Sequence, residues 1–346
     1  MSSLFTRRKT DLVKGFAILF MYIHHFYLDP SRYEGFPIYF FLGEEFVNKV
    51  AVFMKICVAM FMFLSGYGMY LSAQRKQGEH ALALYSIKRY IKLIFSFFFI
   101  FWLVQLVFYP TMRWRKIYGT SLDSLGYFLI DMFGLAHLFH TPTYLGTWWY
   151  ISLISLVIFT FPILFRLFDQ RVWLYMVIIV LIQWIEPIKD LEYVRYLPAF
   201  SFGMLFARYH FVDYLHRKIE QSPHSKWLFG ALMGFGCILC FYFRSVPNIP
   251  IGLKDGLIVS YIISFIVLFI PDFKIGVELG RRSMSMFLTH TLVRTTFFKE
   301  FSYGFYDAGL NLLVFTLVTY MIALAIDEMK VKCGYDRFVD RLTKRI

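Results

Sequence analysis

The stretch LVKGFAILFMYIHHFYL, residues 12–28, is the part of the sequence that most clearly decides the fold. Apart from Lys14, His24 and His25, its residues are apolar, aromatic or glycine. A run of this length approaches the roughly 20 apolar residues that cross a bilayer as a helix. Basic residues precede it, as in a signal peptide, but no small-residue cleavage site follows. We therefore expect the segment to remain in the chain as its first membrane-spanning helix.

The composition of the 346 residues excludes an ordinary water-soluble domain. Hydrophobic residues make up 58% of the chain and charged residues only 17%. So much apolar surface, including 42 phenylalanines, could not be hidden in water without exposing aggregation-prone patches. The net charge of +13 comes from short basic clusters between apolar runs, so we expect contact with the lipid bilayer and none with nucleic acid.

Further apolar segments follow the first one along most of the chain. Because backbone groups in hydrocarbon must be hydrogen-bonded, continuous apolar runs of this kind predict helices. The fold class expected is an all-α polytopic membrane protein, a bundle of about ten transmembrane helices. The predicted spans are 12–28, 50–72, 88–109, 144–168, 172–187, 192–209, 226–243, 254–271, 281–298 and 307–326.

Basic residues near alternate span ends predict the topology, with both termini cytoplasmic. Arg113, Arg115 and Lys116 break the rule, because they fall in a long outer loop, residues 110–143. An apolar stretch near 125–136 is too short to span and indicates a re-entrant or interfacial helix. We expect a membrane domain over residues 1–326, a short charged cytoplasmic tail over 327–346, and a multi-pass location in the plasma membrane.

Lys14 and His25 form a polar pair on the first predicted helix. Their spacing of eleven residues brings them to within about 20° of one helix face and separates them by about 16 Å along the axis. Asp11 and Met21 lie on the same stripe. Ionisable groups inside a span usually face a cavity or a pathway. The alternative is a snorkelling lysine and a histidine satisfied by neighbouring helices, which is also the role we expect for His24.

The polar stripe is part of a set of motifs. Asp11, Lys14, Gly15, Ala17 and His25 resemble the Arg/Lys-x10-His signature that opens the membrane-integral acyltransferase family three. Other segments over nearly the whole chain resemble later motifs of that family in the same order. They are FMFLSGY at 61–67, the basic residues Lys88, Arg89 and Lys92, GTWWYISL at 146–153, PAFSFG at 198–203 and SMSMFLTH at 283–290.

Two residues depart from the family pattern. Lys14 stands where arginine is commoner, and Lys92 replaces the second arginine of an Arg-x-x-Arg pair. Lysine keeps the charge but loses the bidentate fork of arginine.

The resemblance implies an enzyme, a membrane O-acyltransferase and more narrowly an O-acetyltransferase. Its donor would be cytoplasmic acyl-CoA, with acetyl-CoA the expected form, and its acceptor a hydroxyl group of a cell-surface polysaccharide or a lipid-linked sugar. We expect no metal and no permanently bound cofactor. The competing function is a transporter or flippase for a lipid-linked glycan precursor, although no internal repeat is apparent.

The implied site centres on the first helix. His25 would be the general base and Lys14 a cation near the donor phosphates. Lys88, Arg89 and Lys92 would also bind the donor, although positive-inside topology alone would explain that cluster. An acyl-histidine, or an acyl-serine on Ser65, Ser283 or Ser285, is the alternative to direct transfer.

Two further groups are candidate site-lining residues. Ser283, His290 and Arg294 share a face of the ninth predicted span and could complete the site, the alternative being a packed histidine. Trp148 begins the fourth span, where an aromatic belt at the membrane surface is the default interpretation. A platform that stacks on a sugar is the alternative for Trp148.

Overall fold

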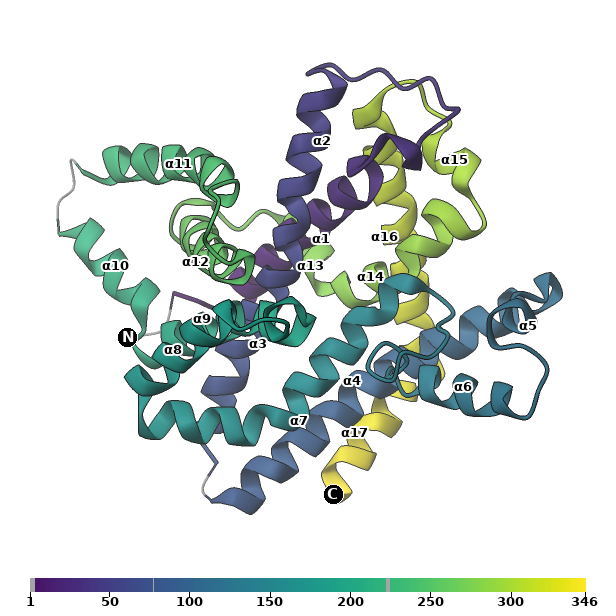
Figure 1. Cartoon of the computed structure of the whole chain (residues 1–346), viewed down its shortest axis with the longest axis horizontal. Helices are drawn as coiled ribbons and strands as arrows, with labels where there is room; N and C mark the ends of the chain where they lie inside the picture. Colours follow the sequence, from purple (N-terminus) through teal and green to yellow (C-terminus); the bar gives the residue numbers. More distant parts are fainter. Residues whose placement is uncertain (1–3, 77, 222–224) are drawn as a thin grey trace. The chain divides into compact units, whose positions relative to one another are not determined.

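Helices make up almost all of the ordered architecture (Figure 1). The computed structural model describes residues 4–76, 78–221 and 225–346; 80% of the chain is helical, and the described residues form no strand. An isolated bridge pairs Tyr39 with Asp307. The all-α class predicted from the apolar runs is confirmed.

The chain divides into two compact units. Unit 1 comprises Met1–Arg75, Leu167–Ser283 and Tyr303–Thr316, and unit 2 comprises Lys76–Arg166, Met284–Ser302 and Leu317–Ile346. The helices of unit 1 are α1 (Arg7–Tyr27), α2 (Glu44–Phe53), α3 (Cys57–Ala73), α8 (Val172–Leu181), α9 (Glu192–Arg208), α10 (Phe211–Glu220), α11 (Ser225–Arg244), α12 (Ile251–Phe269) and α13 (Lys274–Arg281). Those mainly in unit 2 are α4 (Glu79–Val107), α5 (Arg113–Tyr118), α6 (Asp123–Met132), α7 (Trp149–Gln170), α14 (Ser283–Thr291) and α17 (Tyr335–Arg345), while α15 (Lys299–Tyr303) and α16 (Ala308–Lys332) contribute to both.

Six helical segments in the described chain are long and apolar enough to cross a membrane. They are Glu44–Ala73, Glu79–Val107, Gly146–Gln170, Trp227–Arg244, Ile251–Phe269 and Ala308–Lys332. The expected count of ten is not confirmed by length and apolarity alone. The remaining predicted spans are helical but contain charges, as in the first turns of α1, or are short, as in α8 and α9.

Two predicted boundaries need correction. The span expected over residues 281–298 is not one helix, because α13 ends at Arg281, α14 ends at Thr291 and a π-helix, η7 (Leu292–Thr296), follows. The tail expected from residue 327 begins inside α16, which continues to Lys332, and α17 then forms a second helix. The short helix expected near 125–136 is present as α6.

The crossing of α3 and α9 in unit 1 depends on glycines within two of the sequence motifs. Gly66, in the SGY motif of α3, lies against the Phe200 carbonyl of α9, and Gly203 of α9 lies against the Phe63 carbonyl of α3. A Cβ atom added at either glycine would overlap that carbonyl. Small residues at such positions let two helix backbones approach closely. These motif positions therefore have a packing role in unit 1.

A second close crossing joins α1 and α13, also in unit 1 (Figure 1). Gly15 of α1 faces the Gly276 backbone, and Gly280 of α13 faces the Asp11 backbone with no room for a Cβ. The crossing brings the C-terminal end of α13 beside the first turns of α1. Arg281 is thereby placed next to Asp11, 270 residues away in the sequence.

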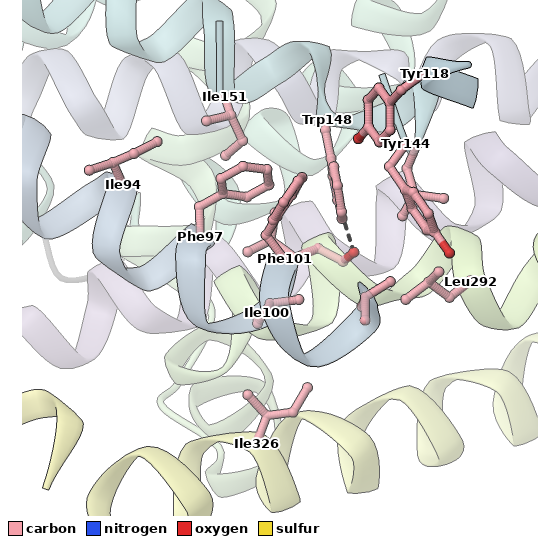
Figure 2. Close-up of a cluster of buried hydrophobic side chains, with 13 residues drawn as sticks. Ile94, Phe97, Ile100, Phe101, Tyr118, Tyr144, Trp148, Ile151, Leu292 and Ile326 are labelled. Carbon is pink, nitrogen blue, oxygen red and sulfur yellow. Dashed lines mark hydrogen bonds between the residues drawn. The ribbon is translucent and has the colours of Figure 1, made fainter. Parts of the chain in front are cut away.

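The core of unit 2 corrects one interpretation of Trp148. Its side chain is only 2% exposed and packs against Phe97 and Phe101, with ring centroids 4.9 and 5.7 Å away. Figure 2 shows the indole among these rings, with Nε1 donating a hydrogen bond to the Leu288 carbonyl at 3.1 Å. Trp148 is therefore a core residue and not part of an aromatic belt, because its polar atom is satisfied inside the protein.

Candidate functional site

The first turns of α1 hold Lys14 beside a buried carboxylate. Lys14 Nζ donates to Asp11 Oδ1 at 3.1 Å, and the Asp11 side chain is 8% exposed whereas that of Lys14 is 33% exposed. One helical turn separates the two residues, as the helical spacing predicts. The pair leaves the ammonium group half-exposed at this end of the helix.

This end of α1 borders a cavity of about 650 Å³, within the range of ligand-binding pockets. Its lining residues are Arg7, Arg8, Asp11, Lys14 and Arg281. Four cations therefore share the cavity with one carboxylate. We refer to it as the Lys14 cavity.

Acidic residues around the Lys14 cavity balance only part of its charge. Asp11 contacts Lys14 and lies 3.9 Å from Arg281, so one carboxylate is shared between two cations. Asp272 lies 3.4 Å from Arg8 at the protein surface, and Glu278 bonds Arg281 at 2.6 Å. An electropositive cavity with several guanidinium groups suits a ligand with phosphate oxygens.

His25 lies near the opposite end of α1, next to an arginine. Arg32 Nη1 donates to the His25 carbonyl at 2.7 Å and lies 3.5 Å from ring atom Nδ1. Because a guanidinium group only donates, Nδ1 is the acceptor in this contact and holds the lone pair of a neutral ring. The His25 side chain is half-buried.

His24 has the structural role that we expected from its different helix face. It is 7% exposed, and Nδ1 donates to the Ala51 carbonyl at 2.8 Å. The bond joins α1 to α2, close to the point where the 3₁₀ segment η2 (Met54–Ile56) interrupts the helical pattern. The two adjacent histidines are therefore in different environments.

The three basic residues proposed to bind the donor all lie on α4 of unit 2. Lys88 and Arg89 are half-buried, and Lys92 is exposed. Lys92 Nζ lies 3.0 Å from Asp340 of α17, and this hydrogen bond lowers the pKa of Asp340. Asp340 thus stays ionised at neutral pH, and Lys92 already has an anionic partner within the chain.

His290, on α14 of unit 2, is fully buried with both ring nitrogens in hydrogen bonds. Nδ1 donates to the Phe287 carbonyl, and Nε2 accepts from Thr291 Oγ1 at 3.1 Å. Thr291 in turn bonds Thr147, which precedes Trp148. These contacts match the packed alternative for His290. The π-helix after Thr291 also shifts Arg294 from the position that a regular helix would give it.

The serine candidates are in helices. Ser65 is half-buried in α3, directly before the tightly packed Gly66, and Ser283 begins α14 as a buried residue. Ser285 Oγ donates to Asp327 Oδ1 at 2.7 Å within unit 2. An activated nucleophile needs a partner of this kind, and in the described chain Ser285 is the one of the three serines whose hydroxyl donates to a carboxylate.

The sequence interpretation missed the arginines of the Lys14 cavity, because they were assigned to membrane topology. Arg7, Asp11 and Lys14 are spaced i, i+4 and i+7, so one helical face already contained the signal for Arg7. Arg281 had no such local signal, because its place depends on the crossing of α13 with α1.

Asp131 of unit 2, in the loop predicted over residues 110–143, was missed as well. Its carboxylate is buried and accepts hydrogen bonds from Tyr118, Thr143 and the Tyr144 backbone, at 2.6, 2.9 and 2.7 Å. It ties α5, α6 and the start of the α7 segment together. Its role is therefore to hold the long loop in shape.

Comparison with known families agrees with the motif order. The acyltransferase family 3 model, described as an acyltransferase domain, matches residues 8–327. Searches of curated proteins and of solved structures find no match. The family predicted from the ordered motifs is confirmed, and with it the enzyme class. Because the match covers nearly all of a chain with six apolar spanning helices, the protein belongs to acyltransferase family 3 and is a membrane acyltransferase.

Proposed function

We propose that the enzyme moves an acyl group, with acetyl the expected one, from cytoplasmic acyl-CoA to a hydroxyl of a cell-surface polysaccharide or lipid-linked sugar. The observation that supports the donor most directly is the Lys14 cavity, in which four cations surround one carboxylate. CoA has a diphosphate and a 3′-phosphate. A guanidinium group can donate two parallel hydrogen bonds to two oxygens of one phosphate. Lys88, Arg89 and Lys92 are the second candidate set for the same phosphates.

The length of α1 is compatible with this donor. The spacing of eleven residues from Lys14 to His25 corresponds to about 16 Å along the helix. In acyl-CoA, the extended pantetheine arm separates the diphosphate from the thioester over a comparable distance. Phosphates held at Lys14 would therefore place the thioester near His25.

His25 supplies the proton transfer in this proposal. Nδ1 accepts the proton of the acceptor hydroxyl as its oxygen attacks the thioester carbonyl, so an ester C–O bond forms and the C–S bond breaks. The imidazolium then gives this proton to the leaving CoA thiolate, which restores the neutral ring. The acceptor hydroxyl would replace Arg32 as the partner of His25 Nδ1. Arg32 would stay nearby, because it also donates to the His25 carbonyl. Direct transfer needs no acyl-serine.

The same proposal includes the topology. Ten spans with both termini in the cytoplasm would put the Lys14 cavity at the cytoplasmic surface of the plasma membrane and His25 nearer the outer surface. The donor would then enter from one side and the glycan from the other.

The function is tested with purified enzyme in proteoliposomes, labelled acetyl-CoA and a glycan extract. His25→Ala should lower transfer by about 100-fold or more, the usual contribution of a general base. Lys14→Arg should be tolerated, whereas Lys14→Gln should raise KM for acetyl-CoA by about tenfold or more, because a charge-assisted contact is lost.

Unchanged thermal stability and insertion would show that the variants are folded. Retained acetyl transfer by folded His25→Ala would refute the mechanism. Movement of a lipid-linked precursor across the bilayer in the absence of any acyl donor would favour the competing flippase function.

A further inference from the structure

A second charged cluster lies in unit 1 at the His25 end of α1. Its centre is Asp255, which is 1% exposed and receives a bidentate contact from Arg244, at 2.7 Å to Oδ1 and 3.2 Å to Oδ2. Arg195 Nη2 lies 4.0 Å from Oδ2, and Lys55 interacts electrostatically with all three. We call Lys55, Arg195, Arg244 and Asp255 the Asp255 cluster.

Backbone contacts connect this cluster to α1. His24 donates to the Ala51 carbonyl, and Arg244 Nη1 donates to the next carbonyl, that of Val52, at 2.7 Å. Both carbonyls precede the 3₁₀ interruption η2, which contains Lys55. His24 accordingly interacts with the charges of Arg244 and Lys55. The Asp255 cluster therefore lies next to the helical turn that presents His25.

The charges around Asp255 do not balance. Both carboxylate oxygens of Asp255 accept hydrogen bonds from Arg244. Asp255 therefore neutralises the charges of Arg195 and Lys55 less completely than that of Arg244. One other cation, Lys254, and one other carboxylate, Glu192, interact with members of the group. The described chain thus places four cations, Lys55, Arg195, Arg244 and Lys254, near two carboxylates, Asp255 and Glu192.

Burial makes this excess of positive charge costly. The side chain of Arg244 is 9% exposed and that of Arg195 is 23% exposed, and Lys55 is half-buried. Arg195 Nε has no hydrogen-bond partner among the described residues. Partly buried cations without a matching anion lose hydration and repel one another. An oxyanion bound by the exposed parts of these side chains would lower both costs.

We propose that the Asp255 cluster binds a phosphate group of the acceptor and so selects phosphorylated glycans or lipid-linked sugar diphosphates over neutral sugars. The inference rests on the proposed function, because an acceptor hydroxyl must reach His25. Arg195 and Lys55 contact the phosphate, while Arg244 is held in place by Asp255 and the Val52 carbonyl. A phosphate bound there positions the sugar hydroxyl at Nδ1 of His25.

The test uses Arg195→Gln and Lys55→Gln in the full-length enzyme, with Lys49→Gln as the control. Lys49 is an exposed residue of α2 that pairs with Glu45, so the control removes one positive charge without touching the cluster. Three acceptors share one sugar: a neutral methyl glycoside, the sugar phosphate, and the lipid-linked sugar diphosphate. Their comparison separates a phosphate on the glycan from one on the lipid carrier.

We expect KM for the phosphorylated acceptors to rise about tenfold or more in each cluster variant, with KM for acetyl-CoA and for the methyl glycoside unchanged. Arg195→Lys should show a smaller rise in KM than Arg195→Gln, because lysine keeps the positive charge but lacks the paired N–H donors of the guanidinium group. The proposal would be overturned if the cluster variants raised KM equally for phosphorylated and neutral acceptors. It would also be overturned if the native enzyme had the same KM for both kinds of acceptor.

A binding measurement keeps this inference separate from the proposed function. A fluorescent lipid-linked sugar diphosphate should bind the native protein in detergent and bind the two cluster variants about tenfold or more weakly. If acetyl transfer fails but this binding difference is found, the phosphate site stands and the proposed reaction does not. If native and variant proteins bind the probe equally, the phosphate site is refuted.

Discussion

Individual residues of the same type have different roles in this protein because their surroundings differ. His24 and His290 are buried, and each donates through Nδ1 to a backbone carbonyl. His25 is half-buried, and its Nδ1 faces a guanidinium group that can only donate. A general base needs a ring nitrogen that can accept a proton, and of these three histidines only His25 is partly exposed with Nδ1 as an acceptor.

The ion pair between Lys92 and Asp340 allows the donor role of Lys92 to be tested at the level of single residues. Lys92→Gln and Asp340→Asn each break the same exposed contact, which contributes little to stability. Only Lys92→Gln removes a cation. If Lys92 binds the donor, we expect that variant alone to raise KM for acetyl-CoA, by several-fold, in steady-state kinetics. A similar rise in both variants would instead assign the effect to the attachment of α17.

At the scale of helices, the interruptions and glycine crossings determine which side chains meet. The crossing at Gly15, Gly276 and Gly280 brings α13 onto α1 and Arg281 to the Lys14 cavity. The 3₁₀ segment η2 lies where His24 and Arg244 bind successive carbonyls of α2. Both ends of α1 are therefore built by contacts with other helices of unit 1.

Two glycines of α3 provide a matched test of the α3–α9 crossing. A Cβ at Gly66 would overlap the Phe200 carbonyl, whereas a Cβ at Gly68 would meet nothing within 4 Å. We expect Gly66→Ala to cost about 1–3 kcal/mol through overpacking. Gly68→Ala should be neutral or slightly stabilising, because alanine favours helix more than glycine does. Thermal unfolding of the detergent-solubilised proteins measures the difference, and equal melting temperatures would contradict the close packing at Gly66.

At the scale of the whole molecule, the number of membrane crossings decides on which side each end of α1 lies. Six segments are long and apolar enough to span, and the expected count of ten needs α1, α8, α9 and the interrupted 281–298 region as well. Such segments can span when their polar groups face protein and not lipid. The donor and acceptor would reach opposite ends of α1 only if α1 crosses the bilayer.

Cysteine labelling in intact cells distinguishes a topology of six membrane spans from one of ten. Asp190 is exposed between α8 and α9, and Lys218 is exposed in α10. With the N-terminus in the cytoplasm, ten spans would place Asp190 outside and Lys218 inside, whereas six would place both outside. In a variant without the four native cysteines, we expect Asp190→Cys to react with a membrane-impermeant maleimide in intact cells. Lys218→Cys should react only after permeabilisation. Labelling of Lys218→Cys in intact cells, or protection of Asp190→Cys there, would refute the ten-span topology.

The local features of this protein were predictable from the sequence. Apolar runs indicated an all-helical membrane protein, and the ordered motifs indicated the acyltransferase family, which the match over residues 8–327 confirmed. The shared face of Asp11 and Lys14 was also predictable, because positions three residues apart on a helix always lie close together. These features depend on composition and on the fixed geometry of one helix.

The tertiary structure alone decided the rest. It placed Arg281 at the Lys14 cavity, buried Trp148 in the core of unit 2, and gathered Lys55, Arg195 and Arg244 around Asp255. In the sequence these residues appear as topogenic charges, an aromatic anchor or loop charges. Their roles depend on contacts between segments far apart in the chain, and no spacing within one helix specifies such contacts. The sequence therefore determined the polar stripe of α1, and packing against other helices determined what surrounds each end of it.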